Sequence, residues 1–280
     1  RPRNLAQPII EVRDLKKGYG NNPLVLEDLS LSFHPGEFTT ILGLSGSGKS
    51  TFLRCLNRLV EPSGGKILIP SSILEHGEIL EDEKPELDIV TLPLGPLRLW
   101  RRRVGMIFQQ FNLAKRLSVL DNVLSGGLGS ANLFPSSLRL FSTQTREQAF
   151  RNLDRIGLLD RAYQRADTLS GGQQQRVAIA RALMQKPRVI LADEPVASLD
   201  PKLSVTILDI LRRIAREDDI SVIISLHTLE LAKNYSDRIV GLSGGRIVFD
   251  GKPDRLEKEA IDRIYQREGS ERARSHAPAL

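Results

Sequence analysis

A glycine-rich stretch at residues 43–50 has the residue types and the spacing of a phosphate-binding loop. Its sequence, Gly-Leu-Ser-Gly-Ser-Gly-Lys-Ser, fits a pattern in which a glycine and four variable residues precede Gly-Lys-Ser or Gly-Lys-Thr. Glycines let the backbone wrap around phosphates, and the amides of a following helix donate hydrogen bonds to them. We expect Lys49 to place a positive charge between the β- and γ-phosphates and the Ser50 hydroxyl to bind Mg²⁺. The other residues predicted to contact the nucleotide here are Gly43, Ser45, Gly46, Ser47, Gly48 and Thr51. The loop indicates a nucleotide but no particular reaction.

Two adjacent carboxylates, Asp193 and Glu194, follow the apolar run at residues 189–192. Parallel sheets bind ligands at the carboxyl ends of their strands, so both side chains are candidates for a site there. Asp193 can hold Mg²⁺ through water, and Glu194 can accept a hydrogen bond from an attacking water molecule. The alternative interpretation is that both carboxylates only cap the next helix.

A second glycine-containing motif, Leu-Ser-Gly-Gly-Gln at residues 169–173, stands directly before a predicted helix. The Ser170 hydroxyl and the amides of Gly171 and Gly172 would form another helix start able to bind an anion. Taken alone, the motif predicts only a helix cap, because Ser-Gly-Gly is common in loops.

The elements that must position these residues can be read from the hydrophobic pattern. Strands are expected at residues 9–15, 24–33, 38–42, 66–69, 104–108, 189–192, 222–225 and 239–242. Helical spacing is seen at residues 51–60, 117–124, 145–156, 171–184, 201–216 and 229–234. The chain therefore begins with a β-rich section. A helical section follows, and then alternating helices and apolar strands that are typical of a buried parallel sheet.

Two segments fit this pattern poorly. Residues 75–88 contain seven acidic residues and one lysine, which predicts a surface excursion or an additional hairpin. Residues 257–280 are highly charged and are expected to form a short helix that continues into a loose tail.

Composition excludes several classes of protein. The chain has 280 residues, of which 40% are hydrophobic and 26% charged, as in ordinary globular proteins. It contains neither an apolar run of roughly 18 residues nor a secretion signal, so no membrane span is expected. Cys55 is the single cysteine and cannot form an intrachain disulfide. We expect further residues to precede Arg1, because the sequence does not begin with Met.

The net charge of +6 is compatible with nucleic acid, an anionic membrane surface or nucleotides as partners. Its basic residues are scattered, apart from a cluster at Arg101, Arg102 and Arg103, and only 5% of the residues are aromatic. A surface that stacks single-stranded nucleic acid would interleave aromatic and basic residues. We therefore expect no nucleic-acid partner.

Six motifs occur in one order along the chain: the phosphate loop, Gln109 after a strand, residues 169–173, the Asp193-Glu194 pair, residues 198–200 and His227. This ordered set resembles the nucleotide-binding subunit of ATP-binding cassette (ABC) transporters over roughly residues 9–252. The resemblance implies an α/β fold of the P-loop NTPase class. In this fold a RecA-like core carries an antiparallel β subdomain and an inserted α-helical subdomain at about 110–187. Residues 253–280 would then be an appended C-terminal helix and tail.

The resemblance also implies roles within one subunit. Tyr19 would stack on adenine, although an edge-strand tyrosine is the alternative. Gln109 would contact Mg²⁺ and the attacking water, with Gln110 as the alternative register. His227 would hydrogen-bond the γ-phosphate; without the resemblance, a single histidine after a strand would be taken as structural. Catalysis is thus expected from Glu194, His227 and Gln109, and metal binding from Ser50, Gln109 and Asp193.

Other implied roles require a second copy of the chain, bound head to tail. Ser170, Gly171, Gly172 and Gln173 would close over the γ-phosphate bound by the opposite subunit, and Asp200 would communicate across the dimer. The cofactors would be ATP and Mg²⁺. Transmembrane permease subunits would be direct partners and a substrate-binding protein an indirect one, which places the chain at the cytoplasmic face of the plasma membrane.

Residues 105–113, 116–124, 162–176 and 193–201 are similar to the ATPase subunits of phosphonate importers, whose relatives import phosphite or hypophosphite. The acidic segment at residues 75–88 is longer than expected for that group. An importer of polar amino acids or another small solute is the alternative. A soluble ABC protein of translation or DNA repair would have two cassettes or a long coiled coil, and a phosphate-loop kinase would lack residues 169–173.

Overall fold

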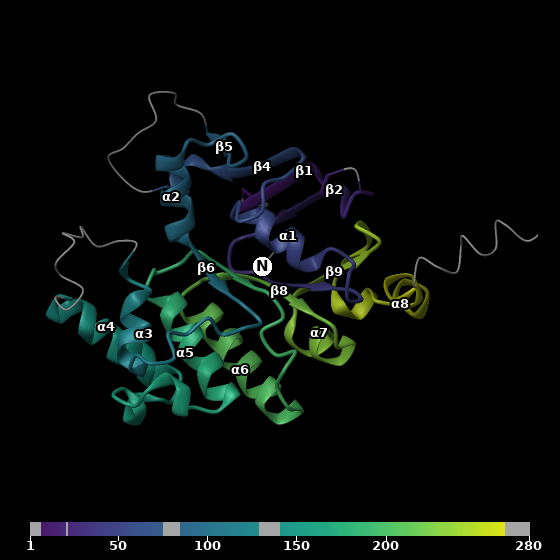
Figure 1. The fold of residues 1–280 in the computed structure, drawn as a ribbon. Coiled ribbons are helices and arrows are strands. Elements are labelled where there is room, and N and C mark those ends of the chain that lie inside the picture. Colours follow the sequence, from purple (N-terminus) through teal and green to yellow (C-terminus); the bar gives the residue numbers. More distant parts are fainter. Residues whose placement is uncertain (1–6, 21, 75–84, 129–140, 267–280) are drawn as a thin grey trace, which may run out of the picture.

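The computed structural model describes residues 7–20, 22–74, 85–128 and 141–266. Within them the chain forms two sheets (Figure 1). A four-stranded antiparallel sheet has the order β2-β1-β4-β5, with β1 (Ile10–Lys17), β2 (Leu26–Phe33), β4 (Gly64–Pro70) and β5 (Glu86–Asp88). A six-stranded sheet has the order β10-β9-β3-β8-β7-β6, with β3 (Phe38–Leu42), β6 (Val104–Ile107), β7 (Val189–Ala192), β8 (Ser221–Leu226), β9 (Arg238–Ser243) and β10 (Arg246–Gly251).

The six-stranded sheet is parallel except for β10, which pairs antiparallel with β9. Helices cover both of its faces, which explains why the central strands β3, β8 and β7 are buried along their whole length. Along β7, Val189 and Leu191 belong to the same buried cluster as α1 (Lys49–Leu56), whereas Ile190 and Ala192 belong to a second cluster with α6 (Pro201–Glu217). The antiparallel sheet lies over α1, so this helix is enclosed between the two sheets (Figure 1).

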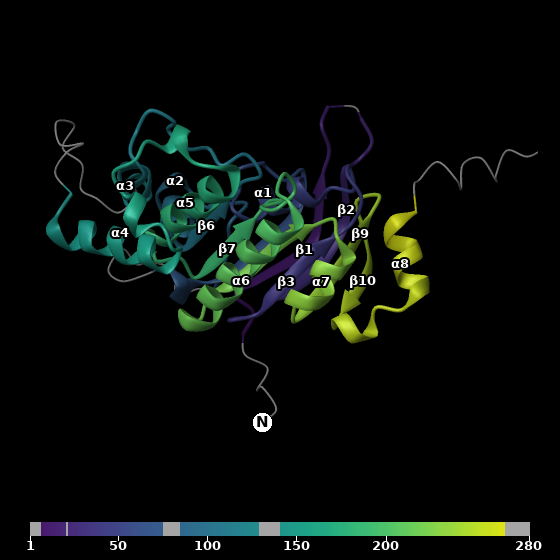
Figure 2. The same ribbon diagram turned by 90° about the horizontal axis from the view of Figure 1, so that it is seen from below.

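The remaining helices are α2 (Leu94–Arg103), α3 (Val119–Ser125), α4 (Thr143–Arg155), α5 (Gly171–Leu183), α7 (Leu229–Tyr235) and α8 (Lys258–Tyr265). Helices α3, α4 and α5 pack against one another at one end of the molecule, and α8 lies at the opposite end beside β9 and β10 (Figure 2). The expected helical section contains α3, α4 and α5, and the expected short C-terminal helix corresponds to α8. None of the described helices is long and apolar enough to cross a membrane.

Helix α2 was not predicted, because it starts in a stretch that contains Gly95 and Pro96. Proline is tolerated there, since the first backbone N–H groups of a helix have no partner within the helix. Trp100 is fully buried and donates from Nε1 to the Leu56 carbonyl oxygen at 3.1 Å, which ties α2 to α1. Two residues of the basic cluster are not fully solvated. Arg101 donates to backbone carbonyls, and Arg103 is partly buried.

Other expectations need smaller corrections. The helix expected at residues 51–60 spans Lys49–Leu56, and the chain leaves it through Arg58, whose φ is 54°. β10 was missed. Of the acidic segment, Glu86–Asp88 forms the edge strand β5 beside β4, whereas residues 75–84 and the expected tail at 267–280 lie outside the described residues.

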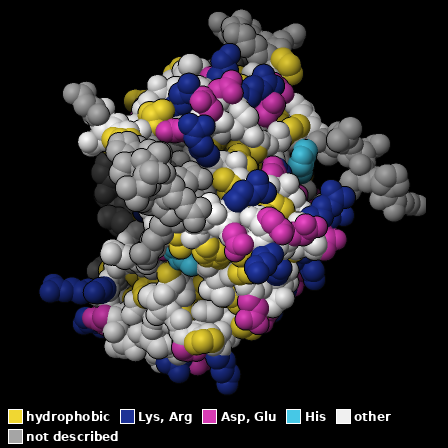
Figure 3. All heavy atoms as spheres, turned by 90° about the vertical axis from the view of Figure 1, so that its right-hand side faces the viewer, with side chains coloured by type: hydrophobic (Ala, Val, Ile, Leu, Met, Phe, Trp, Pro, Cys, Tyr) yellow, Lys and Arg dark blue, Asp and Glu magenta, His cyan; other side chains and the backbone are white. Residues whose placement is uncertain are grey.

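The positive excess is not concentrated on the side of the molecule that Figure 3 shows, where Lys and Arg side chains are interspersed with Asp and Glu. Ion pairs also bring opposite charges together. Arg155 lies 2.8 Å from Asp218, and Arg238 lies 2.5 Å from Asp250. Such pairs neutralise the field of single charges at short range.

The fold makes Cys55 chemically inert. Its side chain is fully buried on α1 between the two sheets, and this burial raises the pKa of the thiol to about 12. Because the thiolate is the reactive form, we expect the native protein to react with iodoacetamide at least about a hundredfold more slowly than the urea-unfolded protein. Mass spectrometry of timed samples measures both rates, and equal rates would contradict the packing of α1.

A candidate nucleotide site at the carboxyl edge of the parallel sheet

The glycine-rich loop connects the end of β3 to the start of α1, as predicted. Gly46 and Gly48 have φ angles of 85° and 101°, in the left-handed region that favours glycine. A side chain at Gly43 would place its Cβ 2.2 Å from the Leu242 carbonyl oxygen. The loop therefore needs glycine at these positions to fold back over the start of α1.

Lys49 is buried at the centre of this loop, with 3% of the residue exposed. Its Nζ donates to the carbonyl oxygens of Gly43 and Leu44, both at 2.9 Å, and lies 3.6 Å from Glu194 Oε1. Burial lowers the pKa of Lys49 below its usual value, and the nearby Glu194 carboxylate opposes this shift. The loop thus holds the Lys49 ammonium group in place. Phosphate oxygens of a bound nucleotide would accept hydrogen bonds from it in place of the backbone carbonyls.

Asp193 follows β7 and is almost fully buried. Its Oδ1 accepts hydrogen bonds from Ser50 Oγ at 2.6 Å and Ser225 Oγ at 3.3 Å, and its Oδ2 accepts one from Arg54 at 3.0 Å. A hydroxyl and a carboxylate side by side are oxygen ligands that suit Mg²⁺. Among the described residues, no group of three or more His, Cys, Asp or Glu could hold a metal. The pair therefore fits Mg²⁺ only if a bound phosphate and water complete the coordination.

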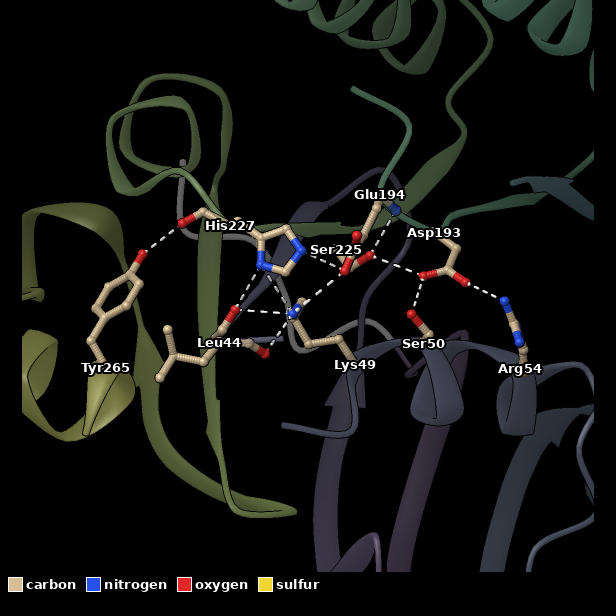
Figure 4. Close-up of polar contacts among 10 residues, drawn as sticks. Leu44, Lys49, Ser50, Arg54, Asp193, Glu194, Ser225, His227 and Tyr265 are labelled. Atoms are coloured by element: carbon tan, nitrogen blue, oxygen red, sulfur yellow. Dashed lines mark hydrogen bonds and ion pairs between the residues drawn. The ribbon is translucent and has the colours of Figure 1, made fainter. Parts of the chain in front are cut away.

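Glu194 and His227 complete the cluster (Figure 4). Glu194 Oε1 lies 2.5 Å from His227 Nε2, and the Glu194 N–H donates to Ser225 Oγ at 2.8 Å. His227 Nδ1 is 3.2 Å from the Gly43 carbonyl oxygen and 3.4 Å from Lys49 Nζ. Glu194 has a φ of 49°, a left-handed value that is uncommon for a residue other than glycine. A carboxylate, an imidazole and an ammonium group thus meet beside the loop.

Gln109 lies at the same edge of the sheet. β6 pairs with β7, and the Asp193 N–H donates to the Ile107 carbonyl oxygen at 2.8 Å, so Gln109 follows β6 beside the two carboxylates. Its side chain is exposed, and the hydrogen bonds given above for Asp193, Glu194 and His227 do not include it. Gln110 is equally exposed, so the choice between the two glutamines remains a prediction.

The second glycine motif stands apart from the loop, at the start of α5 in the helical section (Figure 1). Ser170 and Gln173 form a capping box there, with the Ser170 N–H donating to Gln173 Oε1 at 2.9 Å. Asp200 caps α6 by accepting from the Leu203 N–H at 3.0 Å. Ser170 and Asp200 are both exposed, so each caps its own helix and is also available to a partner.

Tyr19 lies two residues beyond β1, outside the strand, and is 46% exposed. Lys17 Nζ stands 4.6 Å from the centroid of its ring. The ring is exposed and lies outside the strand, and its stacking on adenine stays a prediction.

Three residues of the cluster were not predicted. Arg54 stands four residues after Ser50 on α1, a spacing that places both on one helix face and could have indicated it. Ser225 is polar within the apolar strand β8, which is a weaker signal. Tyr265 donates from its hydroxyl to the His227 carbonyl oxygen at 2.8 Å, and no local pattern indicates this contact between distant segments.

Comparison with known proteins gives this geometry a context. A family model described as ABC transporter matches residues 26–197, which is more than half of the chain and includes the loop, residues 169–173 and both carboxylates. The chain belongs to the ABC transporter family. A relative from Bdellovibrio bacteriovorus named phosphonates import ATP-binding protein PhnC is 47% identical, over 93% of this chain and 95% of the relative. A relative from Halalkalibacterium halodurans named phosphonates import ATP-binding protein PhnC 3 is 46% identical, over 92% and 95%.

Solved structures of ABC cassettes have the same fold. A dimeric cassette in a post-hydrolysis state, bound to ADP and inorganic phosphate, is 31% identical with a TM-score of 0.72 and covers 87% of this chain and 98% of its own. The cassette cbiO1 of Clostridium perfringens is 29% identical with a TM-score of 0.74, over 96% and 99%. The predicted fold class, a P-loop NTPase with an antiparallel β part and a helical part, is confirmed for this ABC protein.

Proposed function

We propose that this chain is the ATP-hydrolysing subunit of an ABC importer that powers uptake of phosphonate or a related reduced-phosphorus anion through partner membrane subunits. The observation that carries the proposal is the identity of 46–47% with two phosphonates import ATP-binding proteins over more than nine tenths of each chain. Residues 9–252 would form the ATPase domain, with the helical part at about 110–187, and residues 253–280 would be appended to it.

In this proposal the phosphate loop binds ATP through its backbone amides and Lys49, while Tyr19 stacks on adenine. Ser50 and Asp193, with Gln109, would hold Mg²⁺, which when bound neutralises charge on the phosphates. Glu194 would orient and polarise the attacking water, and His227 would donate to the γ-phosphate. The 2.5 Å contact between Glu194 and His227 supports their acting on one reacting centre. Positioning and charge stabilisation then supply most of the rate.

A second copy of the chain would complete each site. Ser170, Gly171, Gly172 and Gln173 of one subunit would close over the γ-phosphate held by Lys49 of the other, and Asp200 would contact the dimer partner. The exposure of Ser170 and Asp200, and the likeness to a cassette solved as a dimer, support this arrangement. Closure would act on permease subunits at the cytoplasmic face of the plasma membrane, and a separate binding protein would select the solute.

Transport assays in the source organism test the proposed solute. Deletion of the gene should abolish uptake of radiolabelled methylphosphonate. The wild-type gene should restore that uptake and the Glu194→Gln variant should not. Uptake of a labelled polar amino acid should continue in the deletion strain. Loss of amino-acid uptake with normal methylphosphonate uptake would favour the alternative importer and overturn the proposed solute.

A further inference from the structure

The C-terminal helix α8 reaches the loop that carries His227. Tyr265, the last residue of α8, donates from its hydroxyl to the His227 carbonyl oxygen at 2.8 Å (Figure 4). His227 itself lies between β8 and α7, and its side chain makes the contacts to Glu194 and to the Gly43 carbonyl oxygen described above. The phosphate-loop cluster thus contacts the imidazole ring of His227, and α8 contacts its backbone carbonyl.

The helix that carries Tyr265 is anchored by its packing on the sheet. Ile264 is fully buried against Gly241 of β9, so closely that a Cβ on Gly241 would lie 2.5 Å from Ile264 Cδ1. Ala260 and Leu256 are buried in the same core. Lys233 of α7 donates to the Leu256 carbonyl oxygen at 3.4 Å, which joins the segment before α8 to the helix that follows His227. The tyrosine therefore extends from a rigid support.

We infer that Tyr265 is a positioning residue for His227, whose backbone it holds so that the imidazole faces Glu194 and the γ-phosphate. The inference rests on the proposed role of His227 in ATP hydrolysis. The matched family region ends at residue 197, so the family match does not extend to this contact. Because the carbonyl and the imidazole belong to one residue, a loop released from Tyr265 can rotate and carry the ring away from Glu194.

The hydroxyl can act as a donor throughout the physiological pH range. Burial raises the pKa of Tyr265 above its usual value, so the phenol keeps its proton. A protonated phenol can donate to the carbonyl oxygen, whereas a phenolate would be repelled by it.

The test removes this hydroxyl and compares the result with a matched control. Tyr265→Phe keeps the ring and its packing, and we expect kcat for ATP hydrolysis to fall about two- to tenfold, as for loss of one hydrogen bond, while KM for ATP changes little. Tyr235→Phe is the control, because its hydroxyl also forms a 2.8 Å hydrogen bond, but to the side chain of Asp209 on α6 and not to His227. It should leave kcat unchanged. Equal kcat values for Tyr265→Phe and the wild type would overturn the inference.

A second readout follows the imidazole directly. The chain has four histidines, so histidine-labelled protein gives few NMR signals, and His227→Ala identifies the one that belongs to His227. Tyr265→Phe should shift or broaden that signal alone, and Tyr235→Phe should leave it in place. An unchanged signal in Tyr265→Phe would also overturn the inference, whether or not activity falls.

The two proposals can fail separately. If His227→Ala hydrolyses ATP at the wild-type rate, the proposed role of His227 is wrong. If His227→Ala loses activity and Tyr265→Phe alters neither kcat nor the His227 signal, only the positioning role of Tyr265 is wrong. Where His227→Ala keeps measurable activity, adding Tyr265→Phe should cause no further loss, and an additive loss would show that Tyr265 acts through another group.

Discussion

Replacing Glu194 with Gln should lower ATP turnover by about a hundredfold or more, because the amide cannot polarise water as the carboxylate does. The variant should still fold and bind ATP. Its side chain has nearly the same size, and the hydrogen bond from the residue 194 N–H to Ser225 Oγ does not involve the changed group. Single-turnover hydrolysis and equilibrium ATP binding measure the two effects separately. We expect the ATP-bound dimer to accumulate, since closure is then no longer followed by hydrolysis.

A matched control is Glu147→Gln, which makes the same chemical change on the exposed surface of α4. Exposed ion pairs such as Glu147 with Arg151 contribute little to stability, so this variant should behave as the wild type. If Glu194→Gln hydrolysed ATP as fast as Glu147→Gln, a group other than Glu194 would have to activate the water.

The parts of the site that could be predicted are those with a strong local signal. The loop at residues 43–50 combines fixed residue types with a strand before it and a helix after it, and the structure has that arrangement. The apolar runs of β7 and β8 identify buried parallel strands, whose shared edge brings Glu194 and His227 together.

The parts that were missed depend on contacts between segments far apart in the chain. Helix α2 begins in a sequence typical of a loop and is stabilised by Trp100, whose partner on α1 is 44 residues away. The contact of Tyr265 with His227 joins residues 38 apart and depends on the seating of Ile264 beneath β9. Hydrophobic periodicity indicates the buried face of a single helix or strand, so it does not predict contacts between distant segments.

The separation of the loop from residues 169–173 has a testable consequence. Lys49 is buried in the loop at the carboxyl edge of the parallel sheet, whereas Ser170 is exposed at the start of α5. A disulfide should therefore form between Ser45→Cys on one chain and Ser170→Cys on another when ATP is bound. Cys55 is fully buried and does not compete. Cross-linking of two differently tagged chains tests this geometry and does not require ATP hydrolysis. A disulfide formed only within a doubly substituted chain would contradict the head-to-tail dimer.

Heterodimers decide whether the loop and the second motif act within one chain or between two. Lys49→Ala removes the loop's cation, Ser170→Arg blocks the motif, and each homodimer should lose ATP hydrolysis. A dimer of one Lys49→Ala chain and one Ser170→Arg chain retains one intact composite site if sites are shared. In the proposed transporter, assembled with its membrane subunits, it should regain as much as about half of the wild-type activity, because one of two sites is complete.

The control dimer joins a wild-type chain to a chain that carries both substitutions. It has the same two changes and the same tags, but every shared site in it contains one damaged part, so it should be inactive. If each chain instead used its own loop and its own motif, the outcome would reverse: the control would hydrolyse ATP through its wild-type chain and the mixed single variants would not. The two dimers have identical composition, so a difference in stability or expression cannot produce this reversal. Such a reversal depends only on whether Lys49 and Ser170 of one chain, or of two chains, contact the same γ-phosphate.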